Sequence, residues 1–82
     1  MKLLYFSAAW CGTCKRLGPV MQRLGENGMP IEKIDVDLNQ DLALKYGIRN
    51  IPTVVKINEK GAPVKRFIGV RSEKSVKEFF NG

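Results

Sequence analysis

Trp10-Cys11-Gly12-Thr13-Cys14 contains the two cysteines of the 82-residue chain, three positions apart. Residues 2–7, before this stretch, are apolar and aromatic, which predicts a buried strand. Residues 11–26 have the apolar spacing of a helix, with one stripe made of Cys14, Leu17, Met21 and Leu24. The cysteine pair therefore lies on a strand-to-helix turn. Cys11 is near the helix start, and Cys14 is one turn further on, facing the core.

This placement favours thiol–disulfide exchange. Free backbone N–H groups and the positive end of the helix dipole favour a thiolate at Cys11. Because the thiolate is the nucleophile in such exchange, Cys11 is the expected attacking sulfur. Cys14, turned inward and shielded, would then attack the mixed disulfide and release the reduced substrate. We expect the two sulfurs to differ in exposure, because a two-step dithiol mechanism needs such asymmetry.

Two other interpretations of the cysteine pair are open. A structural disulfide across so short a loop would contribute only about 2 kcal/mol in the loop-entropy model. A structural zinc site needs about four ligands, whereas the chain has two Cys and no His. Carboxylates or a second chain would have to complete it. A redox pair is the favoured interpretation, and we expect no metal.

Length and composition predict a single domain over residues 1–82 with one small core. No apolar run is long enough to span a membrane. The first residues superficially suggest a secretory or lipoprotein signal, but the bulky Trp10 fits a small-residue cleavage site poorly. An isolated C-x-x-C pair in the cytosol is more often catalytic than structural. We therefore expect a cytoplasmic protein, and a monomer.

Lys and Arg number 14 against 8 Asp and Glu, which gives a net charge of +6. The basic residues are spread along the chain, without the dense or aromatic-interleaved run typical of nucleic-acid binding. We expect no nucleic-acid or membrane partner. The charge would speed encounters with acidic proteins, or be no more than a solvated surface.

The rest of the sequence predicts three more strands and two more helices. Strands are expected over residues 31–36, 52–57 and 64–68, with a short helix over 40–46 and a last helix after Ser72. Asn39 and Ser72 are the expected N-caps. A helical crossover makes the first two strands parallel, and the turn at residues 58–61 makes the last two antiparallel. The β-α-β-α-β-β-α order implies an α/β fold with a mixed four-stranded sheet flanked by helices on both faces.

Two separated motifs in this order resemble the thioredoxin family. The first is Trp10-Cys11-Gly12-Thr13-Cys14, followed by Lys15 and Pro19, and the second is residues 46–53, Tyr-Gly-Ile-Arg-Asn-Ile-Pro-Thr. The similarity extends through Phe67-Ile68-Gly69 to the last helix. It implies the thioredoxin fold and a dithiol–disulfide oxidoreductase that acts on protein substrates.

The resemblance also implies roles for individual residues. Cys11 matches the nucleophile and Cys14 the resolving thiol. Ile51-Pro52 matches the family's cis-proline beside the disulfide, although a trans proline opening a strand is the alternative. Gly69 matches a glycine that substrates approach, or is a bend glycine; Trp10 flanks the site, or fills the core. The substrate-binding residues would be Trp10, Gly12, Thr13, Ile51, Pro52, Gly69 and Val70.

Some positions depart from the family pattern. The chain is shorter by the first strand and helix of ordinary thioredoxins. Tyr5 stands where the family usually has a buried aspartate that assists proton transfer at the resolving cysteine. Proton removal from Cys14 would then use water or another group. Lys33 matches the family's lysine near that aspartate and is a candidate for proton-transfer support. Thr13 replaces the usual proline between the cysteines.

The expected function is reduction of protein disulfides without a bound cofactor. Electrons would come from NADPH through a separate thioredoxin reductase. One alternative is a glutaredoxin-like protein that uses glutathione, whose carboxylates Arg49, Arg71 and Lys15 would bind. An alternative of another class is a binding module on the same fold, with redox chemistry incidental.

Overall fold

The computed structural model describes residues 1–82 and contains four strands and three helices. Their order along the chain confirms the β-α-β-α-β-β-α prediction. The elements are β1 (Lys2–Ser7), α1 (Gly12–Glu26), β2 (Ile31–Asp35), α2 (Gln40–Lys45), β3 (Thr53–Ile57), β4 (Pro63–Ile68) and α3 (Glu73–Asn81).

The four strands form one mixed sheet in the order β2-β1-β3-β4. β1 runs parallel to β2 and antiparallel to β3, and β3 pairs antiparallel with β4. These pairings confirm the predicted crossover and hairpin. β1 and β3 are central, so the chain segment that leads into the cysteine motif is held on both sides.

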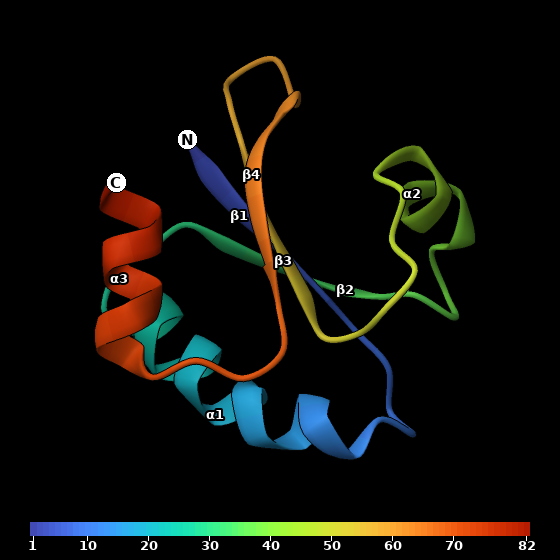
Figure 1. Cartoon of the computed structure of the whole chain (residues 1–82), viewed down its shortest axis with the longest axis horizontal. Coiled ribbons are helices and arrows are strands. Elements are labelled where there is room, and N and C mark those ends of the chain that lie inside the picture. The colour runs from blue at the N-terminus through green and yellow to red at the C-terminus, as the bar shows by residue number, and fades with distance from the viewer.

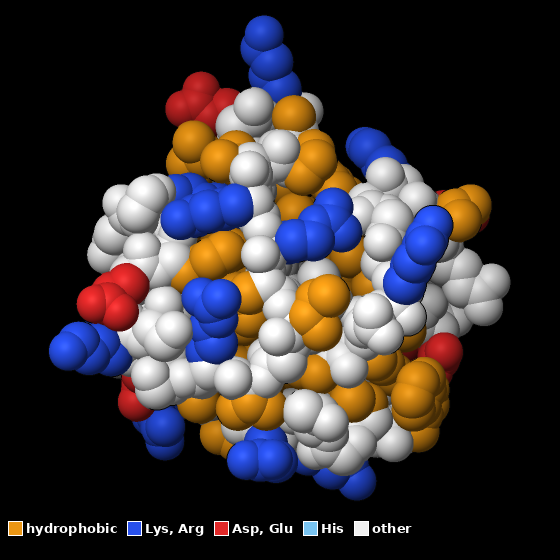
Figure 2. Space-filling model, in the orientation of Figure 1, with side chains coloured by type: hydrophobic (Ala, Val, Ile, Leu, Met, Phe, Trp, Pro, Cys, Tyr) orange, Lys and Arg blue, Asp and Glu red, His pale blue; other side chains and the backbone are white.

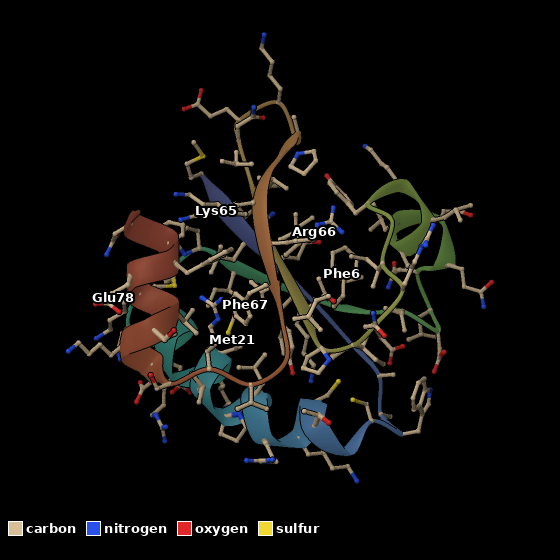
Figure 3. All side chains as sticks on the ribbon, viewed as in Figure 1. Phe6, Met21, Lys65, Arg66, Phe67 and Glu78 are labelled. Carbon is tan, nitrogen blue, oxygen red and sulfur yellow. The ribbon has the colours of Figure 1, made fainter.

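Helices cover both faces of the sheet, as predicted (Figure 1). Side chains alternate along β1, so Leu3 and Tyr5 pack toward α1 and α3, while Leu4 and Phe6 pack on the α2 side. Figure 3 shows Phe6 on the α2 side and Met21 and Phe67 on the other. Two apolar clusters result, one on each face.

The apolar stripe of α1 is buried at the four predicted positions, which are Cys14, Leu17, Met21 and Leu24. Their burial holds the helix against the sheet. The packing of the later turns of α1 therefore determines where its first turn lies. Val76 and Phe79 do the same for α3, and the Phe79 ring meets Phe67 edge-on with centroids 4.9 Å apart.

Both predicted N-cap positions are confirmed, but only one of the two side chains makes a capping bond. Ser72 Oγ accepts a hydrogen bond from Ser75 N at 3.2 Å and caps α3 as expected. Asn39 occupies the N-cap position of α2, but its side chain makes no capping bond. Its Nδ2 instead donates to Asp35 O at 3.0 Å, so the amide ties the end of β2 to the loop rather than the helix start.

Basic side chains are distributed over the surface. On the face shown in Figure 2 they stand apart from one another, separated by apolar and uncharged atoms. None of the three helices is long and apolar enough to cross a membrane.

Candidate active site

Cys11 is the N-cap residue of α1, and its sulfur faces the free backbone of the first helical turn. Its φ and ψ of −86° and 114° are extended, as N-cap geometry requires. Cys14 N lies 3.2 Å from Cys11 Sγ and donates a hydrogen bond to it. The sulfur thus takes the place that a Ser or Asp oxygen has in an ordinary cap. A donor aimed at the sulfur stabilises negative charge there.

Cys14 lies within the first turn of α1 and points toward the core, as predicted. Burial, and after it a hydrogen bond with the Cys11 side chain, raises the pKa of its thiol to about 11. At neutral pH Cys14 is therefore protonated. Both cysteines are free thiols.

The predicted difference in exposure between the two sulfurs is wrong. Cys11 is 7% exposed and Cys14 is 5% exposed, so both are buried to nearly the same degree. What distinguishes them is their surroundings. Cys11 Sγ accepts a hydrogen bond from a backbone N–H at the start of α1, whereas burial raises the pKa of the Cys14 thiol. The asymmetry is electrostatic.

The Ile51–Pro52 peptide bond is cis and lies beside Cys11. Cys11 Sγ is 3.8 Å from Ile51 O, although forty positions separate the two residues. Pro52 immediately precedes β3, whose expected start at residue 52 moves to Thr53. The structure thus brings together the two motifs that the sequence singled out.

Gly69 joins this group through its backbone. Gly69 N donates to Pro52 O at 2.9 Å, which places the end of β4 next to the cis peptide. Its φ is +96°, where a side chain is strained, while a Cβ at this position would meet no atom within 4 Å. Within the chain, the backbone conformation accounts for glycine here, and the space above it is open.

Trp10 lies on the surface, so the core-filling interpretation is wrong. It is 70% exposed, and its Nε1 donates to Asp37 Oδ2 at 2.8 Å. The bond holds a large apolar ring beside Cys11. Gly12 and Thr13 are exposed between the cysteines. Asp37 was not among the predicted site residues, because only the folded chain brings the loop after β2 next to the cysteine motif.

Tyr5 lies on the inner side of Cys14. Its hydroxyl donates to Cys14 O at 3.0 Å, and burial raises the pKa of the phenol to about 12. The group is therefore neutral at physiological pH and cannot supply the negative charge that a carboxylate would have at this position. Lys33 is paired with Tyr5 in the β1–β2 register, and both side chains line a cavity that also reaches Cys14.

The structure thus places the predicted residues in two groups. Cys11, Ile51, Pro52 and Gly69 meet at the outer side of the cysteine pair, with the exposed Trp10 and Val70 nearby in the sequence. Lys33 lies with Cys14 at the inner side. No three side chains of the metal-binding types come together anywhere in the chain.

Known proteins are similar to this chain in sequence and in fold. The sequence model of the thioredoxin family matches residues 1–82. A thioredoxin from Bacillus subtilis is 38% identical over 79 residues, which cover 93% of this chain and 75% of that protein. A bifunctional thioredoxin reductase/thioredoxin from Mycobacterium leprae is 35% identical over 74 residues, covering 87% of this chain and 16% of that one.

A solved structure of a thioredoxin variant from Halobacterium salinarum superposes with a TM-score of 0.87 at 40% identity, covering 96% of this chain and 70% of that one. Fold, cysteine spacing and relatives agree. The chain belongs to the thioredoxin family and is a thiol–disulfide oxidoreductase that reduces protein disulfides.

Proposed function

We propose that Cys11 is the nucleophile and Cys14 the resolving thiol of this disulfide reductase. The observation that carries this assignment is the place of Cys11 at the N-cap of α1, where Cys14 N donates to Cys11 Sγ at 3.2 Å and the start of the helix favours negative charge on the sulfur. The raised pKa of Cys14 keeps the second sulfur as a thiol until it is needed. Redox chemistry is the function of the fold here rather than incidental to binding.

The first step is attack of the Cys11 thiolate on a substrate disulfide. A bond forms between Cys11 Sγ and one substrate sulfur, and the other substrate sulfur leaves with the electron pair. The substrate chain would lie across Trp10, the Ile51–Pro52 backbone and the Gly69–Val70 segment. The open space above Gly69 allows an incoming backbone to approach. Gly12 and Thr13, exposed between the cysteines, complete this surface.

In the second step Cys14 attacks Cys11. The Cys14–Cys11 disulfide forms, the substrate thiolate leaves, and the proton of Cys14 is released. No bound cofactor is required, because both electrons pass between sulfur atoms. Lys33, which lines the cavity at Cys14, supports this proton release through its positive charge.

The oxidised pair must then be reduced by another protein. The Mycobacterium leprae relative joins a thioredoxin reductase and a thioredoxin in one chain. By analogy, the electron donor here is a separate thioredoxin reductase that uses NADPH, and the partners are disulfide-containing proteins. We place this chemistry in the cytoplasm and in a monomer, in which residues 1–82 form one domain.

Covalent trapping tests the two roles. Cys14→Ser should accumulate a mixed disulfide with insulin, visible by non-reducing mass spectrometry, because the adduct on Cys11 cannot be resolved. Cys11→Ser should form no adduct and have no turnover. Equal trapping by both variants would reverse or remove the assignment.

The electron donor is tested separately. We expect insulin reduction to be driven by thioredoxin reductase and NADPH, with little turnover when glutathione and glutathione reductase replace them. Faster turnover with glutathione would instead establish the glutaredoxin-like alternative. Insulin reduction that survives Cys11→Ser would show that Cys11 is not the nucleophile. Failure of the wild type to reduce insulin with either donor would remove the reductase assignment and leave the binding module.

A further inference from the structure

A cavity of about 250 Å³ lies against the inner side of Cys14, between α1 and the edge strand β2. It is large enough for several water molecules, since one needs only about 10–15 Å³ of such space. Several of the side chains that line it can gain or lose a proton. The titratable side chains that line it are Tyr5 from β1, Cys14 and Lys15 from α1, and Lys33 and Asp35 from β2.

The β1–β2 register places the β2 side chains there. Tyr5 is paired with Lys33, and Ser7 with Asp35. Side chains on paired positions of a sheet point to the same face, and Tyr5 reaches α1 through its hydrogen bond to Cys14 O. Lys33 and Asp35 are therefore both on the α1 face of β2.

Asp35 is half-buried, and one of its oxygens is held. Asp35 Oδ1 accepts from Asp37 N at 2.8 Å, which orients the carboxylate of this cavity-lining residue. The same loop carries the hydrogen bond between Asp37 and Trp10. The carboxylate is thus a positioned group at the end of β2 and not a freely rotating surface charge.

The resolving step needs a group that takes a proton from Cys14. The phenol of Tyr5 is itself protonated, since burial raises its pKa to about 12. Lys15 and Lys33 are cations, and Cys11 is bonded to the substrate at this stage. Among the groups that line the cavity, only the carboxylate of Asp35 is a base at neutral pH.

We propose that Asp35 accepts the proton of Cys14 through water in this cavity during the resolving step. The proposal rests on the roles proposed above for Cys11 and Cys14. As the Cys14–Cys11 bond forms and the bond from Cys11 to substrate breaks, the electron pair leaves on the substrate sulfur. Cys14 is oxidised, the substrate sulfur is reduced, and the proton moves to Asp35 and then to solvent. Lys15 and Lys33 stabilise negative charge on the sulfur during the transfer.

This role for Asp35 accounts for the presence of Tyr5 at the position where the family usually has a buried aspartate. The family's usual carboxylate near the resolving cysteine is replaced by a neutral phenol, and a different carboxylate lines the same cavity from the neighbouring strand. The proton of Cys14 therefore leaves toward a carboxylate on β2 instead of one on β1.

The two steps can be timed separately with 5,5′-dithiobis(2-nitrobenzoate). Reduced protein mixed with one equivalent releases one thionitrobenzoate when Cys11 attacks and a second when Cys14 resolves the adduct. Asp35→Asn keeps the acceptor for Asp37 N but removes the base. We expect this variant to slow the second release at least about tenfold at neutral pH, while the first release keeps its wild-type rate and reports an intact fold.

The pH profile of the second release separates proton transfer from a structural effect. In Asp35→Asn the rate should rise nearly tenfold per pH unit between about pH 6 and 9, following the ionised fraction of Cys14. The wild-type rate should rise less steeply, and Asp35→Glu should recover part of it. Asp41→Asn, an exposed carboxylate on α2, is the matched control and should behave as wild type.

The outcomes are distinct. If Asp35→Asn leaves the rate of the second release unchanged, or if Asp41→Asn slows that release equally, the role of Asp35 is overturned and the cysteine roles stand. Release of a single equivalent by the wild type would show that Cys14 does not resolve the adduct, and would overturn the proposed cysteine roles together with this inference.

Discussion

Both faces of the sheet carry a buried apolar cluster, but the two faces differ in chemistry. The face toward α1 and α3 carries Cys14, the buried phenol of Tyr5 and the cavity that Lys33 and Asp35 line. The face toward α2 carries an apolar cluster in which Phe6 and Tyr46 meet at a ring-centroid distance of 6.0 Å. The titratable side chains that the sheet contributes to the cavity at Cys14 thus all lie on one face. Substitutions on that face should change rates, whereas those on the α2 face should change stability.

Truncation of the α2-face core should have the largest effect on stability. Phe6 is fully buried, so Phe6→Ala should lower the free energy of unfolding by about 3–5 kcal/mol. An 82-residue domain typically has roughly 4–12 kcal/mol in total, so the variant would be near its unfolding limit. Urea titration followed by circular dichroism measures the change.

Leu44→Ala is the control for this prediction, because Leu44 is an exposed leucine on α2. Its unfolding free energy should remain within about 0.5 kcal/mol of wild type. Equal destabilisation by both substitutions would mean that α2 packs on the sheet differently from the arrangement described above.

Alkaline pH should destabilise the reduced protein through the α1 face. The pKa of Cys14 is raised to about 11 in the folded chain, so the unfolded chain loses this proton first. The stabilisation is complete below the ordinary thiol pKa and is lost as the pH rises through the folded value. Between about pH 8.5 and 10.5, wild type should lose about 1–2 kcal/mol more than Cys14→Ser. Urea titrations of both proteins under a phosphine reductant measure this difference, and parallel losses would contradict the raised pKa.

The two buried tyrosines allow a direct comparison of the faces. Tyr5 OH donates to Cys14 O at 3.0 Å, and Tyr46 OH donates to Gly61 O at 2.7 Å on the opposite face. Each Tyr→Phe substitution should cost about 1 kcal/mol of unfolding free energy. Neither should change the pH dependence of the resolving step between about pH 6 and 9, because a phenol with a pKa of about 12 does not ionise there. An altered profile in Tyr5→Phe alone would identify the phenol as part of the proton path.

Substitutions at the N-caps of α3 and α2 should give the smallest difference in unfolding free energy. Ser72→Ala removes a capping bond and should cost about 1 kcal/mol. Asn39→Ala should cost less, because that side chain makes no cap and its bond to Asp35 O is exposed. Thermal or urea unfolding resolves the two values, and a larger loss at Asn39 would contradict the observed capping.

Much of the fold was predictable because each element carries its own local signal. The stripe from Cys14 to Leu24 predicted which side of α1 is buried, and Ser72 predicted the start of α3. The second motif, around Pro52, predicted the partner of the cysteine turn through the family resemblance. These features depend on residues that are neighbours in sequence or belong to a known motif.

The parts of the site that were missed depend on registers and contacts across elements. Asp35 reaches the cavity because it is paired with Ser7, and Asp37 meets Trp10 beyond the carboxyl ends of β2 and β1. Neither contact follows from periodicity. The equal burial of the two cysteines was also missed, because the segment around Ile51 covers Cys11, and its approach depends on the tertiary fold.

The edge position of β2 has a consequence for association between chains. β2 pairs with β1 on one side only, so its other row of backbone N–H and C=O groups is unpaired. Exposed edges of this kind are templates for aggregation, and charged side chains oppose such pairing. The charges of Lys33 and Asp35 thus also oppose the pairing of β2 with a strand of another chain. A chain in which both charges are neutralised is expected to self-associate through β2 as its concentration rises.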